Sequence, residues 1–207
     1  LLNKDTLYYS VYTLLANHWG QGDTIDEGFT WDQNEWWNHM SALKNYQRPE
    51  IAGGQLPAGA YAADVAANLA VLEGWITRHP ETEFDIFLSP YSILFWDKVI
   101  RDGSVEAVFA AIRQVGETLL QYDNVKIYGY LMDADIVADL DNYCDYVHHS
   151  GAVCQEILAM LRADEGRLTA ENLEETLASW HEFVIHYDYE KFWDESFWHQ
   201  WNAEHGA

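Results

Sequence analysis

The feature that most constrains the fold is a pair of short apolar segments separated by one amphipathic helix. The segments "FDIFLSP" (residues 84–90) and "VKIYGY" (residues 125–130) each have the pattern of a buried strand. Between them, Val105, Phe109 and Ile112 lie on one stripe at helical spacing. Strands joined by a crossover of this length pair in parallel, with a right-handed connection. The sequence therefore predicts a βαβ unit and an α/β fold.

The rest of the chain has mostly helical patterns. Apolar residues at helical spacing predict helices over residues 3–17, 58–78 and 151–163, and a last helix for which Thr169 is the expected N-cap. The sequence thus predicts fewer strands than helices, and a parallel sheet of two strands is hardly stable alone. Either further strands escape the pattern, or polypeptide outside this chain completes the sheet.

The length favours a single domain over all 207 residues. Within it, residues 1–57 hold a helix and a Gly- and Trp-rich loop, residues 58–163 the βαβ core, and residues 164–207 a helix with an aromatic tail. No stretch is long and apolar enough to predict a membrane span. Cys144 and Cys154 are too few for a disulfide framework; a bridge between them is conceivable, and two buried thiols are the preferred interpretation.

The charge is strongly negative, with 34 acidic against 11 basic residues and a formal net charge of −23. Nucleic acid is therefore excluded as an expected partner, because neutralising phosphates requires clustered Lys and Arg. An anionic membrane surface would also repel this chain. The charge favours solubility, with attraction of a cationic partner as the alternative.

The candidate site lies in "LDNYCDYVHHSG", residues 140–151, which follows the second predicted strand. In open α/β sheets, functional loops lie beyond the carboxyl ends of the strands. Asp145 could hold the Nδ1–H of His148, whose Nε2 would then act as general base toward a serine. The bare D-x-x-H pattern is common, so solvated loop residues or a helix cap are the alternative. Ser150, beside His149, is expected to cap the next helix.

No serine stands in a G-x-S-x-G nucleophile motif. "GDT" at residues 22–24 imitates a G-D-S block, but no predicted strand precedes it, and we interpret it as a loop. Ser89 and Ser92, after the first predicted strand, are better placed. A Ser-Pro pair at that point is nevertheless typical of a turn that ends a strand.

The histidines do not have the spacing of a metal site, which requires three or four converging ligands. His148 and His149 are adjacent and should point to different sides, while His181 and His186 are five apart, which is wrong for one helical face. We therefore expect no metal and no other cofactor.

Residues 80–193 resemble the SGNH (GDSL-type) hydrolase superfamily. They are most similar to a bacterial branch allied to extracytoplasmic proteins that O-acetylate alginate or assist D-alanylation of cell-wall polymers. "FDIFLSPYSILFW" resembles the late strand with its proline loop, and "GRLTAENLEETLASWHEFVIHYDYEKF" the C-terminal helix. "NVKIYGYLMDADIVADLDNYCDYVHHSGAVCQEILAML" resembles the final strand, the D-x-x-H block and the closing helix. The resemblance implies part of a three-layer α/β/α fold, helix-rich, with few parallel strands and its N-terminal strands outside this chain.

The resemblance assigns Asp145 and His148 as the acid and base of a catalytic triad. The family's G-D-S block, glycine block and G-x-N-D-type block are not found here, so the resemblance places the nucleophilic serine outside this chain. It implies a serine esterase or O-acyltransferase that acts on acyl esters, of a cell-envelope glycan or a small ester, in an extracytoplasmic location. A missing N-terminal segment or a protein partner would complete the sheet.

Two alternatives stay open. One is a non-catalytic carbohydrate- or protein-binding module of the same fold, and the other is an unrelated α/β domain in which D-x-x-H is accidental. For substrate binding we consider Trp31, Trp36 and Trp37 of the Trp-rich loop, with Ser89 and Tyr91 after the first strand. Core packing is the more common use of such aromatic residues.

Overall fold

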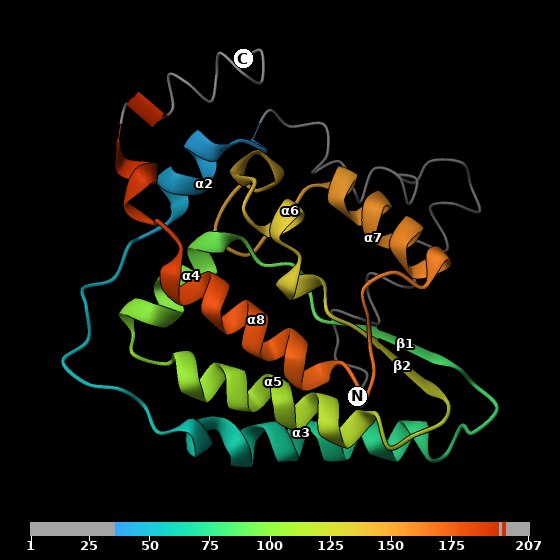
Figure 1. Ribbon diagram of the computed structural model, residues 1–207. Helices are drawn as coiled ribbons and strands as arrows, with labels where there is room; N and C mark the ends of the chain where they lie inside the picture. The colour runs from blue at the N-terminus through green and yellow to red at the C-terminus, as the bar shows by residue number, and fades with distance from the viewer. Residues whose placement is uncertain (1–35, 195, 198–207) are drawn as a thin grey trace, which may run out of the picture. The chain divides into compact units, whose positions relative to one another are not determined.

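The computed structural model describes residues 36–194 and 196–197, which belong to one compact unit, Trp36–Ala207 (Figure 1). The predicted helix at residues 3–17, the "GDT" segment and Trp31 lie outside the described residues, and the single domain of residues 1–207 stays a prediction. The described α-helices, 3-10 helices (η) and strands are α2 (His39–Asn45), η2 (Ala58–Tyr61), α3 (Ala62–Ile76), β1 (Phe84–Phe87), α4 (Ile93–Arg101), α5 (Val105–Leu119), β2 (Val125–Tyr128), η3 (Tyr130–Met132), α6 (Ala134–Val137), η4 (Leu140–Asn142), α7 (Gly151–Ala163), β3 (Arg167–Leu168), α8 (Leu173–His186) and η5 (Glu190–Trp193).

The sheet confirms the predicted βαβ unit. β1 pairs in parallel with β2, with Phe84 opposite Val125 and Phe87 opposite Tyr128, and α4 and α5 connect them. β3 was not predicted, and it pairs antiparallel with β2, so that the order β1-β2-β3 makes β1 an edge strand of the described sheet. The sheet is therefore mixed. β3 is a strand that the sequence patterns did not show, so the sheet has one more strand than predicted.

Helices cover both faces of the sheet, because the side chains of β2 alternate between two cores. Val125 and Ile127 belong to the larger core, which α4, α5 and α8 fill. Tyr128 points the other way and packs with Val153 and Ile157 of α7. In Figure 1, α3, α5 and α8 lie on one side of the strands and α7 on the other. The fold is a helix-rich α/β fold with this α/β/α layering.

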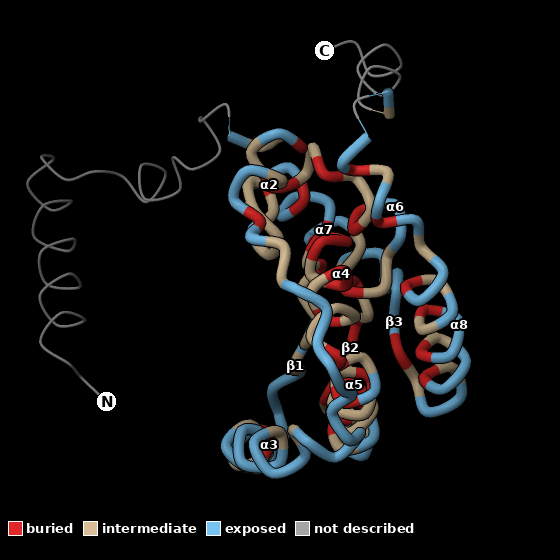
Figure 2. The backbone as a smooth tube through the Cα atoms, turned by 90° about the vertical axis from the view of Figure 1, so that its left-hand side faces the viewer, coloured by how far each residue is buried: buried red, intermediate tan, exposed pale blue. Residues whose placement is uncertain are grey.

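The helix α4 was missed by the sequence patterns, although it lies at the centre of the larger core. Trp96 is fully buried there, with its ring centroid 5.3 Å from that of Phe109 on α5 and 5.9 Å from that of Trp180 on α8. Figure 2 shows the buried positions of α4, β2 and α5 gathered together. α4 therefore packs with both α5 and α8, and the three helices form one layer.

The predicted helices that fall on described residues are confirmed, with one correction at a cap. Ser150 caps α7, since its hydroxyl accepts a hydrogen bond from the Val153 N–H. Thr169 is not the N-cap of α8, which is Asn172. Instead, the Thr169 N–H donates to Asn172 Oδ1 and the Asn172 N–H to Thr169 Oγ1. This reciprocal pair closes a turn before the helix, which therefore begins at Leu173.

The two cysteines are unbridged. The expectation of two buried thiols is wrong for Cys154, which is exposed on α7, because the buried stripe of that helix runs through Val153 and Ile157. Cys144 is partly buried, and burial raises the pKa of its thiol. Among the described helices, none has the length and apolar character that crossing a bilayer requires.

Candidate functional site

The D-x-x-H loop, which we define as residues 142–150, is closed by its own backbone. The Ser150 N–H donates to the Asn142 carbonyl at 2.8 Å, and the Cys144 N–H donates to the His148 carbonyl at 3.2 Å. Between these bonds, Tyr143 and His149 face each other in an isolated antiparallel bridge. The loop is therefore a hairpin whose ends are fixed.

This loop is also fastened to the connection between β1 and α4. The buried Tyr143 hydroxyl donates to the Pro90 carbonyl at 2.8 Å. The Ser92 hydroxyl and its backbone N–H both donate to the Tyr146 carbonyl. The loops that leave the carboxyl ends of the parallel strands β1 and β2 thus meet, at the edge of the sheet where α/β proteins place their chemistry.

The structure brings Asp145 and His148 together as the sequence predicts. His148 Nδ1 lies 2.6 Å from Asp145 Oδ2, and Asp145 Oδ1 accepts hydrogen bonds from the backbone N–H groups of Val147 and His148. Burial raises the pKa of the Asp145 carboxyl, but these hydrogen bonds outweigh burial and leave the pKa below its usual range. The carboxylate is therefore ionised at neutral pH and holds the imidazole by Nδ1, so that Nε2 is the nitrogen suited to act as a base.

The structure places His149, the neighbour of the predicted base, against Ser89. Its Nε2 is 3.5 Å from Ser89 Oγ, while its Nδ1 is 3.4 Å from the Ser150 carbonyl oxygen and 3.7 Å from Cys154 Sγ. Burial lowers the pKa of His149, and the neighbouring His148 lowers it further. His149 is therefore mainly neutral at pH 7. No local pattern signals its contact with Ser89, which spans sixty residues of sequence.

A second pair of aspartate and histidine was not predicted at all. His39, at the start of α2, is buried, and its Nδ1 lies 2.7 Å from Asp141 Oδ1. The same oxygen accepts the His39 backbone N–H at 2.8 Å. Asn45, at the other end of α2, donates through Nδ2 to the Cys144 carbonyl. These contacts hold α2 against the start of the D-x-x-H loop.

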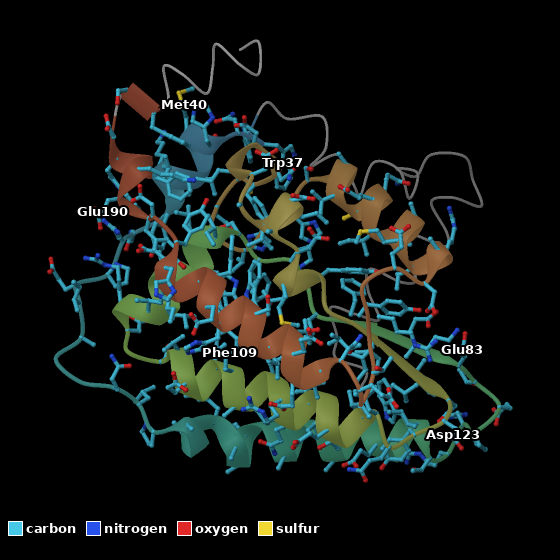
Figure 3. The ribbon with its side chains drawn as sticks, viewed as in Figure 1. Trp37, Met40, Glu83, Phe109, Asp123 and Glu190 are labelled. Atoms are coloured by element: carbon cyan, nitrogen blue, oxygen red, sulfur yellow. The ribbon has the colours of Figure 1, made fainter. Side chains whose placement is uncertain are left out.

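The aromatic residues considered for substrate binding differ in exposure and packing. Trp36 is 64% exposed and Trp37 partly buried, and both come just before α2 (Figure 3 labels Trp37). Tyr91 instead packs against Phe95, with ring centroids 5.1 Å apart, and joins the larger core. Tyr91 is thereby best explained as a core residue, while no contact in the described residues assigns Trp36 or Trp37 to a sugar site.

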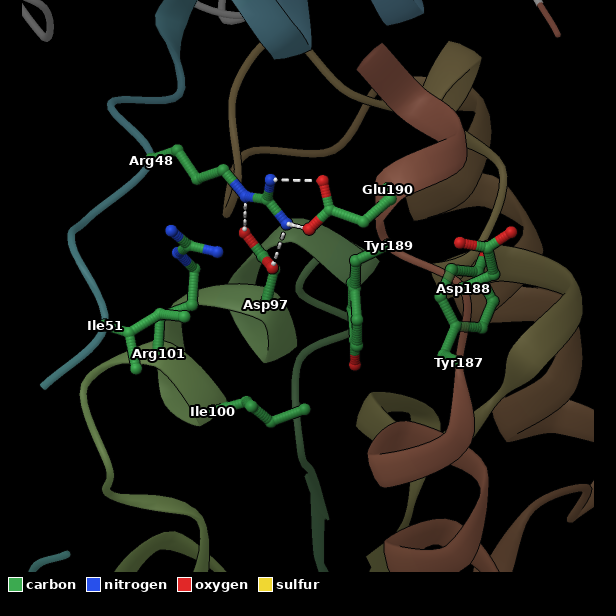
Figure 4. A pocket seen from close by; sticks show the side chains of 9 residues that line it. All are labelled: Arg48, Ile51, Asp97, Ile100, Arg101, Tyr187, Asp188, Tyr189 and Glu190. Carbon is green, nitrogen blue, oxygen red and sulfur yellow. Dashed lines mark hydrogen bonds and ion pairs between the residues drawn. The ribbon is translucent and has the colours of Figure 1, made fainter. Parts of the chain in front are cut away.

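A separate cavity of about 270 Å³ lies between the segment after α2, α4 and the approach to η5 (Figure 4). At its rim, Arg48 donates two hydrogen bonds to the buried Asp97 and two to Glu190. The Tyr46 hydroxyl donates to Asp97, and the Trp193 ring lies 3.9 Å from the Arg48 guanidinium carbon. These charges are paired with one another, so the cluster has the character of a structural clasp.

Within residues 36–194, 196 and 197, no group of three or more His, Cys, Asp and Glu side chains is arranged to hold a metal ion. No family model, curated protein or solved structure matches this chain. The D-x-x-H loop is therefore the feature from which a function can be inferred.

Proposed function

We propose that this chain supplies the acid–base pair of a serine-type acyl-transfer site, in an esterase or O-acyltransferase of the SGNH type. The observation that carries the proposal is the Asp145–His148 hydrogen bond of 2.6 Å at the carboxyl ends of β1 and β2. The closed D-x-x-H loop supports it, because a catalytic pair must be held in place before the substrate arrives.

In the proposed reaction, a serine attacks the carbonyl carbon of an ester. His148 Nε2 takes the serine proton and returns it to the departing alcohol oxygen, while Asp145 holds Nδ1–H and stabilises the imidazolium. Following the resemblance, the proposal assigns the attacking serine to polypeptide outside this chain and the substrate to acyl esters of a cell-envelope glycan. The 58% exposure of the His148 side chain suits a base that must meet a large substrate.

A second candidate is a non-catalytic carbohydrate-binding module of the same fold. The observation that favours it is the 64% exposure of Trp36, because exposed indole rings are suited to stacking on sugars. In that case Asp145 and His148 would serve only to stabilise the D-x-x-H loop.

A fluorophosphonate probe, which reacts with activated serines, distinguishes the two candidates. We expect it to label the complete product of the gene that encodes this chain, and His148→Ala to slow labelling about a thousandfold or more. His186→Ala is the matched control, because His186 is also exposed and lies beside a carboxylate, Glu182. Absence of labelling would contradict the proposal and favour a binding module, and equal labelling of the His148 variant would contradict the role of His148 as the base.

A further inference from the structure

Ser89 occupies a fixed position at the carboxyl end of β1. Just before it, the Leu88 N–H donates to the Tyr128 carbonyl, and the Leu88 carbonyl accepts the Leu131 N–H at 2.9 Å. Just after it, Pro90 has a restricted backbone, and its carbonyl accepts the Tyr143 hydroxyl. Ser89 therefore stands between two clamped residues, which preorganises the direction of its hydroxyl.

The Ser89 hydroxyl faces the Nε2 atom of His149. His149 Nδ1 lies 3.4 Å from the Ser150 carbonyl oxygen, which can only accept, and 3.7 Å from Cys154 Sγ. In the tautomer that donates Nδ1–H to this carbonyl, the lone pair of Nε2 is directed toward Ser89 Oγ. The separation of 3.5 Å is long for a hydrogen bond, but contacts between nucleophile and base are often loose before substrate binds. The lowered pKa of His149 keeps the base form available.

The buried serines of the described residues have structural roles, whereas Ser89 is partly buried. Ser92 and Ser104 donate their hydroxyls to backbone carbonyls, of Tyr146 and Val99, and Ser150 caps α7. Ser89 differs, because its hydroxyl meets an imidazole. Its backbone N–H also donates to no acceptor within residues 36–194, and the N–H of a nucleophilic serine is a suitable donor to an oxyanion.

From this geometry we propose that Ser89 is a nucleophile of this chain, with His149 as its general base. In the step, Ser89 Oγ forms a bond to the carbonyl carbon of an ester as its proton passes to His149 Nε2. The bond from that carbon to the alkoxy oxygen then breaks, and Nε2 returns the proton to the departing alcohol. Water, deprotonated by the same nitrogen, later cleaves the acyl-serine. This pair goes beyond the proposed function, since it uses neither Asp145 nor His148.

The test uses the 207-residue chain itself, treated with a fluorophosphonate and analysed by peptide mapping. We expect the adduct on Ser89 of the folded wild-type chain, no adduct there after denaturation in urea, and labelling about a hundredfold slower in His149→Gln. Ser196→Ala, which changes an exposed serine outside the site, should label at the wild-type rate.

The outcomes separate the two proposals. Labelling of Ser89 that persists in His148→Ala supports the Ser89–His149 pair alone. Labelling of a different serine that is lost in His148→Ala supports only the proposed function. The Ser89 proposal is overturned by an adduct at other residues only, by no adduct, or by an unchanged rate in His149→Gln.

Discussion

The clasp formed by Arg48, Asp97 and Glu190 joins segments that are up to 142 residues apart in sequence. We predict that Arg48→Met, which removes the charge and keeps an unbranched side chain, lowers the free energy of unfolding by about 3 kcal/mol. The reason is that Asp97 would keep its charge without a cation beside it, and an unpaired buried carboxylate destabilises the folded state.

The magnitude follows from the two carboxylates that Arg48 contacts. The Asp97 side chain is 3% exposed, and removing one partner of a buried ion pair costs about 3–5 kcal/mol. The lower end applies, because Arg48 is itself partly exposed and the Tyr46 hydroxyl still donates to Asp97. The Glu190 side chain is 74% exposed, and such a pair contributes at most about 1 kcal/mol.

Urea unfolding followed by tryptophan fluorescence measures this difference. With a slope of about 2 kcal/mol per molar urea, the midpoint should fall by about 1.5 M in Arg48→Met. Glu190→Gln, the control that touches the same guanidinium, should shift it by less than about 0.5 M. Adding Asp97→Leu to Arg48→Met should restore much of the stability, because no buried charge is then left unpaired. Equal losses in the Arg48 and Glu190 variants would refute this reasoning.

Three further predictions concern the D-x-x-H loop and the helix α7 that follows it. Tyr143→Phe should lower stability by about 1–3 kcal/mol, because the buried Pro90 carbonyl loses its donor; an unchanged urea midpoint would contradict this. Asp145 has a lowered pKa in the folded state, so it adds stability above pH 4, which is lost as the pH falls through that lowered pKa. Asp145→Asn should therefore be less stable at pH 7, with the difference shrinking in unfolding curves measured below about pH 4. A thiol reagent should modify the exposed Cys154 before Cys144, as peptide mapping of the folded chain would reveal; the reverse order would contradict the structure.

The parts of the fold that the sequence predicts are those with a strong local period. β1, β2 and the stripe of α5 are apolar patterns long enough to recognise. β3 has only two residues, Arg167 and Leu168, and exists because β2 offers an edge for pairing. α4 escaped because it spans only nine residues and because the charged Asp97 lies within its buried stripe, which interrupts the apolar pattern.

For the candidate site too, contacts between residues close in sequence were predicted and contacts between distant residues were not. Asp145 and His148 were predicted because their contact lies within one turn of chain. The pairs of His39 with Asp141 and of Ser89 with His149 join residues 102 and 60 positions apart, which only the folded chain brings together. Spacing in a sequence reports local geometry, and long-range pairs leave no such trace.

The position of β1 at the edge of the described sheet has a consequence for self-association. The Phe84 and Leu88 N–H groups point to β2, so the alternation of the strand directs the backbone of Asp85 and Phe87 to the opposite side. An edge of this kind is a template for pairing between copies, and the 41% exposed Phe87 adds an apolar contact to it. The charge of the exposed Asp85 and the shortness of the strand oppose such pairing. Within the described residues, the charge of Asp85 is therefore a feature that disfavours edge-to-edge pairing of two copies through β1.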